Sequence, residues 1–228
     1  VVEKVYDSAE VVSPMAAAIG TLAFAGQIFC DFAGYSTIAI GAAMCLGFAL
    51  PDNFRFPYAA IGFSDFWQRW HISLSSWLRD YLYISLGGNR HGTFNTYRNL
   101  MITMLLGGLW HGASWTFVVW GGLHGLYLVM ERGAVAAFGR WRVWKTSLGQ
   151  VSLALVTFGL VCLAWVFFRA PGFDKAFEII QAGLFLHAER QVFVTSAESV
   201  IVVSVMAILL LVHWLLRNTN LEEAVSRL

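Results

Sequence analysis

Residues 100–130 read LMITMLLGGLWHGASWTFVVWGGLHGLYLVM, a long stretch of the chain rich in both glycine and large apolar residues. It holds six glycines and two histidines but no Lys, Arg, Asp or Glu. A helix that crosses a bilayer needs roughly 20 apolar residues, so the stretch suits one long tilted helix or two short ones. Glycines spaced four residues apart, such as Gly108 and Gly112, let helices pack closely. We therefore predict a short or re-entrant pair of glycine-rich helices that bends at residues 112–114.

The rest of the chain also has the composition of a membrane protein. Of its 228 residues, 58% are hydrophobic and 13% are charged, and this charged share is about half that of an average soluble domain. Further apolar blocks cover residues 15–50, 148–168 and 200–216. A polar patch at residues 30–37 interrupts the first block, so we expect one crossing there, followed by a shorter or re-entrant helix. The sequence thus predicts an all-α, multi-pass membrane helical bundle.

Residues 62–84 have the pattern of an amphipathic helix at the membrane interface. His71 lies on the polar flank of this helix, and Asp65 and Arg69 have the i,i+4 spacing of an ion pair. Tryptophans beside arginines are typical of a helix that lies in the interface rather than crossing it. Residues 174–186 form a shorter amphipathic stretch. On a helical wheel, one arc of about 120° collects the large apolar side chains of the first segment, which are Phe63, Phe66, Trp67, Trp70, Leu74, Trp77, Leu78 and Tyr81.

We expect residues 1–228 to form a single transmembrane domain. The chain opens on VVEK, without an initiator methionine or signal peptide, so we expect further helices N-terminal to it. Basic residues, among them Arg132, Arg140 and Arg142, gather in the loop that follows the glycine-rich pair. If that pair dips into the bilayer and returns, the positive-inside rule places this loop and the basic interfacial segment in the cytoplasm. The net charge of +1, without a basic stripe, argues against a nucleic-acid partner.

Two histidines are the main candidates for chemistry. An imidazole can take and return a proton near neutral pH, and His111 lies in the uncharged block among glycines. The structural alternative for His111 is a buried histidine bonded to a carbonyl of a neighbouring helix. His71 is the second candidate, and its alternative is an ordinary amphipathic-helix histidine. No histidine pair has helical zinc-site spacing and no Gly-Xaa-Ser-Xaa-Gly motif occurs, so we expect no metal site and no serine nucleophile.

A series of motifs resembles one known family. Residues 65–84 read DFWQRWHISLSSWLRDYLYI, and LGGNR (86–90), GGLWHG (107–112) and WGGLHG (120–125) follow in order. Asp31 opens DFAGYS upstream of them, and Glu131-Arg132 lies downstream. Together they resemble the membrane-bound O-acyltransferase (MBOAT) superfamily. The resemblance is to its alginate O-acetyltransferase branch, to which the D-alanyl transferases of teichoic acid are related.

This resemblance implies an enzyme of the inner cell membrane. It matches His111 to the essential histidine of the family and His71 to a supporting one. The implied reaction moves an acetyl group from a cytoplasmic thioester, such as acetyl-CoA, toward hydroxyls of an exported, alginate-like polysaccharide. The implied partners are an extracytoplasmic transferase protein, the polysaccharide and membrane lipid, with no bound cofactor. The motifs also supply our candidates for substrate binding, which are Trp70, Trp110, Asp31, Arg69 and Asn89.

Three alternatives remain open at this level. D-alanyl transfer to teichoic acid uses the same chemistry with another donor. A proton- or ion-coupled transporter would use Asp31, His71 and His111 as a relay, because acids and histidines at membrane depth serve that purpose. A non-catalytic membrane scaffold is the third. Labelled acetyl transfer in membranes, set against ion flux in liposomes, separates the enzyme from the transporter.

Overall fold

The computed structural model describes residues 1–139, 142–184, 191–192 and 194–219, and these are almost entirely helical. Arg140, part of the loop used to predict topology, lies outside the described residues. The elements in chain order are α1 (Val2–Tyr6), β1 (Val11–Val12), α2 (Pro14–Cys45), the 3-10 turn η1 (Pro57–Ala59), α3 (Phe63–Trp67), α4 (Ile72–Trp77), the π-helical turn η2 (Leu78–Tyr83), α5 (Gly92–Trp110), α6 (Trp115–Phe138), the 3-10 turn η3 (Arg142–Lys145), α7 (Ser147–Arg169), α8 (Phe173–Gly183), β2 (Gln191–Val192) and α9 (Ser196–Leu216).

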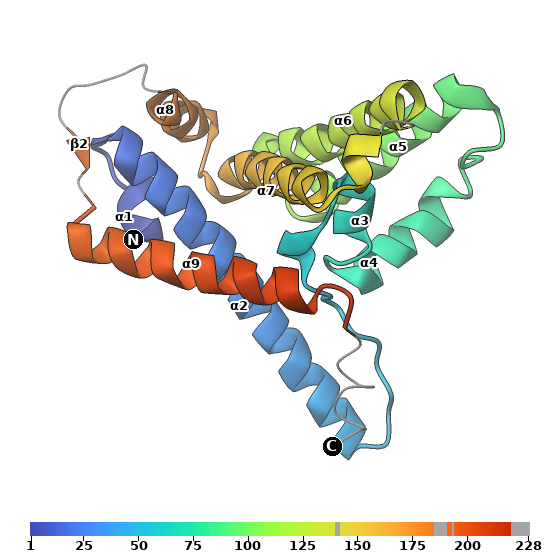
Figure 1. The fold of residues 1–228 in the computed structure, drawn as a ribbon, viewed down its shortest axis with the longest axis horizontal. Helices are drawn as coiled ribbons and strands as arrows, with labels where there is room; N and C mark the ends of the chain where they lie inside the picture. Colours follow the sequence, from blue (N-terminus) through green and yellow to red (C-terminus); the bar gives the residue numbers. More distant parts are fainter. Residues whose placement is uncertain (140–141, 185–190, 193, 220–228) are drawn as a thin grey trace.

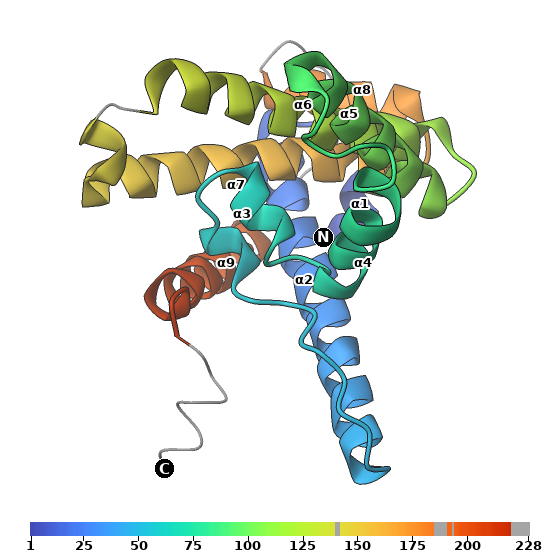
Figure 2. The same cartoon turned by 90° about the vertical axis from the view of Figure 1, so that its right-hand side faces the viewer.

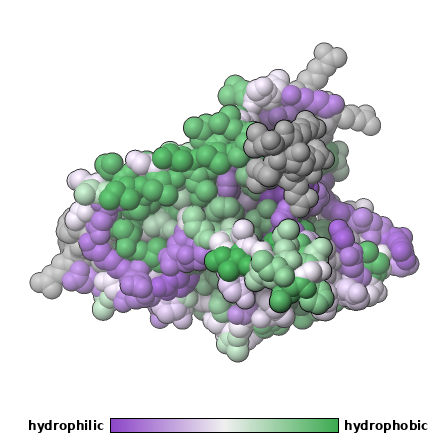
Figure 3. All heavy atoms as spheres, turned by 90° about the horizontal axis from the view of Figure 1, so that it is seen from below, coloured by the Kyte–Doolittle hydropathy of each residue, from purple (hydrophilic) through white to green (hydrophobic). Residues whose placement is uncertain are grey.

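Three of these helices, α2, α7 and α9, are long and apolar enough to cross a membrane. Their bounds confirm the spans predicted at residues 148–168 and 200–216, and the fold class with them. In the most apolar part of α7 half of the residues are buried, whereas most of those in α2 and α9 are not. Figure 3 shows a broad apolar band on the face seen from below. Unburied apolar side chains of this kind suit contact with lipid.

Helix α2 is one continuous helix, so the prediction of a second, shorter helix after residue 30 is wrong. Ser13 caps its start by accepting a hydrogen bond from the Ala16 N–H at 3.0 Å. The polar patch contains no proline, and Thr37 donates back to the Ala33 carbonyl at 2.9 Å, so its hydroxyl is satisfied without leaving the helix. The C-terminal half of α2 extends away from the other helices (Figure 1). Residues 46–56 then run back beside it (Figure 2).

Helices α5 and α6 form the predicted glycine-rich pair, and the bend falls where it was predicted. With 19 and 24 residues, the two helices are longer than the short helices expected within residues 100–130. Helix α5 ends at Trp110, and Ser114 caps α6 by accepting a hydrogen bond from the Thr116 N–H at 3.3 Å. A methyl group on Gly121 would collide with the Met104 carbonyl of the opposite helix. The small residues therefore set the close approach of the two helices. Helix α6 of this pair lies beside α7 (Figures 1 and 2).

Residues 62–84 do not form the single amphipathic helix that we predicted. They form α3, α4 and η2, and the break between α3 and α4 falls at His71, whose backbone is left-handed (φ 44°, ψ 55°). Backbone bonds from the returning segment cause the break, because Arg55 donates to the Arg69 carbonyl at 2.9 Å and Ile72 donates to the Asn53 carbonyl at 3.0 Å. The predicted apolar arc therefore does not form one buried face: Phe63 and Phe66 of α3 are buried, whereas Trp77 and Tyr81 further along are exposed.

The predicted amphipathic stretch 174–186 corresponds to α8, although residues 185 and 186 lie outside the described part. Helix α8 packs against α2 and α7. The pair Val11–Gln191 and Val12–Val192 forms a short parallel ladder between β1 and β2. Helix α9 crosses α2 (Figure 1). The helices thus enclose one aromatic core rather than two separate ones.

Candidate active site

A cavity of about 610 Å³ lies where α2, the α3–α4 corner, the α5–α6 pair and α7 meet. Its wall is mostly aromatic, and it holds both candidate histidines. The lining residues are Phe24, Gln27, Ile28, Asp31, Phe32 and Tyr35 of α2, Trp67, Trp70 and His71 at the corner, Trp110, His111 and Trp120 of the glycine-rich pair, and Trp165, Phe168 and Arg169 of α7.

His111 lies at the C-terminal end of α5, where its N–H donates to the Gly108 carbonyl at 3.0 Å. Its ring lies edge-on to Trp120 and Phe168, with ring centroids 5.0 and 5.3 Å away. The ring forms no hydrogen bond to another described residue, so the carbonyl-bonded structural role that we considered does not apply within this part of the chain. An aromatic setting with free ring nitrogens leaves this imidazole available for proton transfer.

His71 reaches the same cavity from the break between α3 and α4. Its ring lies edge-on to Phe32 and to Trp110, with ring centroids 4.7 and 6.4 Å away. Burial, and secondly the nearby His111, lower the pKa of His71 to about 4. His71 is therefore neutral at physiological pH, and at least one of its ring nitrogens can accept a hydrogen bond.

The helix before His71 is held in place by side chains from two other helices, α6 and α7. Glu131 of α6 accepts hydrogen bonds from the N–H groups of Phe63 and Ser64, at 2.9 and 2.8 Å. Thr157 of α7 accepts from the Gly62 N–H at 3.0 Å. These bonds satisfy N–H groups at the start of α3 that the helix itself leaves unpaired. Glu131 thereby ties the helix that follows His111 to the helix that precedes His71.

Among the predicted substrate-binding residues, Trp70, Trp110 and Asp31 line this cavity, and Arg69 and Asn89 do not. Arg69 donates from Nε to Asp65 at 2.7 Å and from Nη1 to the carbonyl of Arg217 at 2.9 Å. It therefore joins the corner to the end of α9.

Asn89 lines a second cavity of about 580 Å³ together with Arg132, Glu131 and Tyr97. Its Oδ1 accepts from Arg132 at 2.8 Å. The structure thus places Asn89 in a second pocket, which neither His71 nor His111 lines.

Two residues at the cavity were missed by sequence reasoning. Arg169 ends α7, lines the cavity and pairs with both carboxylate oxygens of Asp7, at 3.0 and 2.7 Å. A basic residue at the end of an apolar span was the available signal. Asn53 lies in the turn segment before α3 and contacts His71, with Oδ1 and Nδ1 3.3 Å apart. No local pattern marks it, because its partner is distant in sequence.

The cavity is lined by one acidic residue, Asp31, by one arginine, Arg169, and by the two neutral imidazoles. Within the described ranges, no group of three or more His, Cys, Asp or Glu side chains could hold a metal ion. What the arrangement offers is a proton acceptor, His111, in an apolar chamber with a second imidazole close by. Such a chamber suits proton transfer to and from a bound organic substrate.

The chain is similar to several known proteins. A probable alginate O-acetylase, AlgI, of Pseudomonas putida is 53% identical over 158 residues, which are 69% of this chain and 31% of that protein. A peptidoglycan O-acetyltransferase of Helicobacter pylori is 42% identical over 176 residues, 77% of this chain and 33% of that protein. A teichoic acid D-alanyltransferase of Bacillus subtilis is 30% identical over 164 residues, 64% of this chain and 39% of that protein.

The chain therefore spans about a third of the length of these relatives. A model of the membrane-bound O-acyltransferase family matches residues 2–171, which include every residue that lines the histidine cavity. Because that match covers most of the chain, the chain belongs to the membrane-bound O-acyltransferase family.

Proposed function

We propose that this chain forms the catalytic part of an O-acyltransferase, and that transfer takes place in the cavity that His71 and His111 share. The observation that carries the proposal is this shared cavity. The two histidines come from different elements, and the fold brings them to one aromatic chamber in a membrane bundle. If the two histidines lined separate, unconnected surfaces, a mechanism that uses both of them could not operate.

In the proposed reaction His111 acts as the general base. It takes the proton of the acceptor hydroxyl as the oxygen attacks the thioester carbonyl carbon, so that a C–O bond forms and the C–S bond breaks. The imidazolium of His111 then returns its proton to the departing thiolate, which leaves as a thiol.

The proposed substrates follow from the relatives. The donor is a cytoplasmic thioester, acetyl-CoA, and the acceptor is a hydroxyl of an exported, alginate-like polysaccharide, because the names of similar proteins include probable alginate O-acetylases. An extracytoplasmic transferase protein and membrane lipid are the proposed partners, and the inner cell membrane is the proposed location. D-alanyl transfer to teichoic acid is the second candidate, and identities of 30% and 37% to D-alanyltransferases favour it less.

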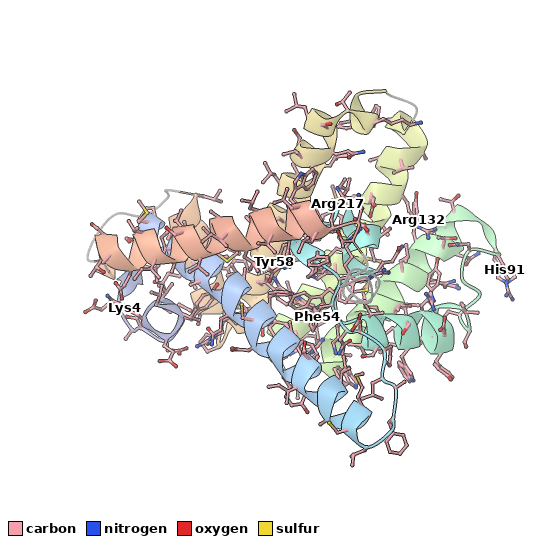
Figure 4. The ribbon with its side chains drawn as sticks, turned by 60° about the horizontal axis from the view of Figure 1, so that its bottom comes forward. Lys4, Phe54, Tyr58, His91, Arg132 and Arg217 are labelled. Carbon is pink, nitrogen blue, oxygen red and sulfur yellow. The ribbon has the colours of Figure 1, made fainter. Side chains whose placement is uncertain are left out.

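The test uses the full-length protein, reconstituted in liposomes with a labelled acyl thioester. His111→Ala should lower acyl transfer by roughly 100-fold or more, the size of a general-base contribution. His91→Ala is the matched control, because His91 lies at the outer edge of the molecule, far from the centrally placed Phe54 and Tyr58 (Figure 4). Transfer by His111→Ala at the wild-type rate would refute the assignment. Histidine-dependent ion flux without acyl transfer would favour a transporter.

A further inference from the structure

Asn53 belongs to the segment that returns along α2 and meets the His71 corner. Its carbonyl accepts from the Ile72 N–H at 3.0 Å, so its backbone is fixed one residue away from His71 in the chain. The next residue, Phe54, lies edge-on to Phe32 and Trp70, with both ring centroids 5.0 Å away. Figure 4 shows Phe54 near the centre of the molecule beside α2. The segment is thus anchored at Asn53 itself and at the residue that follows it.

The amide of Asn53 has only one orientation that satisfies its neighbours. One end of the amide lies 3.2 Å from the backbone nitrogen of Ser73 and 2.9 Å from the Ser73 hydroxyl. A backbone N–H can only donate, so this end must be the carbonyl oxygen, Oδ1. The other end, Nδ2, donates to the Ser36 hydroxyl of α2 at 3.3 Å.

This orientation has a consequence for His71, whose Nδ1 lies 3.3 Å from the same Oδ1. A carbonyl oxygen only accepts hydrogen bonds, so Nδ1 must carry the proton for the contact to be a bond. The Ser73 hydroxyl also lies 3.4 Å from Nδ1, but its one hydrogen serves the shorter bond to Asn53. In a neutral imidazole the proton on Nδ1 leaves Nε2 bare.

We propose that Asn53 is a positioning residue that fixes His71 in the Nδ1–H tautomer, so that Nε2 serves the cavity as a hydrogen-bond acceptor. This inference rests on the proposed function for its chemical meaning. In this tautomer neutral His71 accepts a hydrogen bond from an O–H or N–H group of a substrate, and Nε2 cannot donate one to the oxyanion. Of the two roles open to His71, orienting a substrate or stabilising the oxyanion, the first remains.

Ring-nitrogen NMR of the full-length protein, labelled with ¹⁵N-histidine at neutral pH, tests the tautomer directly. Protonated and bare imidazole nitrogens resonate in separate ranges, and the signals missing from a His71→Gln spectrum belong to His71. We expect a protonated Nδ1 and a bare Nε2 in the wild type, and the same in Asn53→Asp, which keeps the acceptor. Asn53→Leu should give a mixture of both tautomers. A wild-type proton on Nε2, or an unchanged tautomer in Asn53→Leu, would overturn the proposal.

Kinetics then measure what the tautomer contributes. Asn53→Leu should lower kcat by about tenfold, the equivalent of one net hydrogen bond. Asn53→Asp should restore most of it. Asn95→Leu is the matched control, because Asn95 is half-buried on α5, does not line the histidine cavity, and bonds locally to the His91 carbonyl at 2.6 Å. A kcat loss in Asn53→Leu that Asn53→Asp does not restore would contradict the positioning role.

The NMR spectra and the activity measurements test different parts of the argument, so each can contradict its part without the other. If Asn53→Leu does not accumulate in membranes, the wild-type and Asn53→Asp spectra still decide the tautomer. If the spectra agree with the proposal while His71→Ala transfers acyl groups at the wild-type rate, the tautomer stands and the catalytic use of His71 is wrong. If the spectra disagree while His71→Ala is inactive, the proposed function stands and the role of Asn53 is wrong.

Discussion

Substitution of Glu131 should disturb the active site without touching either histidine. Its Oε2 accepts from the N–H groups of Phe63 and Ser64, at 2.9 and 2.8 Å, and from the Ser64 hydroxyl at 3.2 Å. Glu131→Ala removes all three bonds and leaves two backbone donors at the start of α3 without an acceptor. Glu131→Gln keeps one acceptor oxygen and loses only the charge.

The expected magnitude follows from these bonds. A hydrogen bond to a charged group contributes about 1.5–3 kcal/mol, and the contributions of neighbouring bonds do not simply add. Because Glu131 is only half-buried, water replaces part of the loss, and Glu131→Ala should cost about 2–4 kcal/mol. Glu131→Gln should cost about 1 kcal/mol, since it exchanges a charged acceptor for a neutral one.

The effect on activity should exceed the effect on stability. Glu131 joins the helix after His111 to the helix before His71, so its loss lets the two imidazoles move apart. A displacement of about 1 Å can cost roughly 100-fold in rate. We therefore expect Glu131→Ala to lose about 10-fold to 100-fold in kcat at a temperature where it is still folded.

The assay pairs acyl transfer in liposomes with thermal unfolding of the same preparation. Glu10→Ala is the control, because Glu10 is exposed and its side chain makes no hydrogen bond or ion pair with another described residue. Wild-type turnover and an unchanged melting temperature in Glu131→Ala would refute the reasoning. A lower melting temperature with unchanged kcat would show that Glu131 holds the fold but not the two histidines.

Three further predictions concern other parts of the molecule. Gly121→Val should prevent accumulation of the protein, because the added side chain meets the Met104 carbonyl of α5, whereas Gly133→Ala, with nothing within 4 Å, should be tolerated. The ring of His71 should titrate with a midpoint near its lowered pKa of about 4 rather than the ordinary ~6.5. Because the unfolded chain binds this proton at a higher pH than the folded chain does, folding stability should fall as pH drops from about 6.5 toward 4. An NMR titration midpoint near the ordinary value would contradict the burial of His71. Asp7→Asn should lower stability by less than about 1 kcal/mol, measured by thermal unfolding, because the Asp7 side chain is 48% exposed in its pair with Arg169.

The sequence predicted those features that depend on local chemistry. The length of an uncharged apolar run was enough to predict the spans α7 and α9. A helix that crosses a bilayer needs a minimum number of apolar residues, whatever it packs against. The bend between α5 and α6 was predicted because the uncharged stretch is longer than one crossing needs and carries glycine near its middle. His111 was singled out for a similar reason, as an imidazole in a block without formal charge.

Contacts between distant segments decided what the sequence left open. The periodicity of residues 62–84 favoured one helix, but backbone bonds from residues 53 and 55 break that helix at His71 and turn its ring into the cavity. Asn89 and Arg69 belong to the same motifs as the histidines, yet tertiary partners draw them to Arg132 and Arg217.

The glycine-rich stretch by itself determined that a helix pair would carry His111. Its small side chains permit only a close pair, and this is a property of the residues themselves. Whether His111 would share a chamber with His71 depended on Glu131 and on the returning segment at Asn53, whose partners lie far away in the chain. Only the folded structure sets such long-range hydrogen bonds, because each donor has many possible acceptors until packing leaves one within reach.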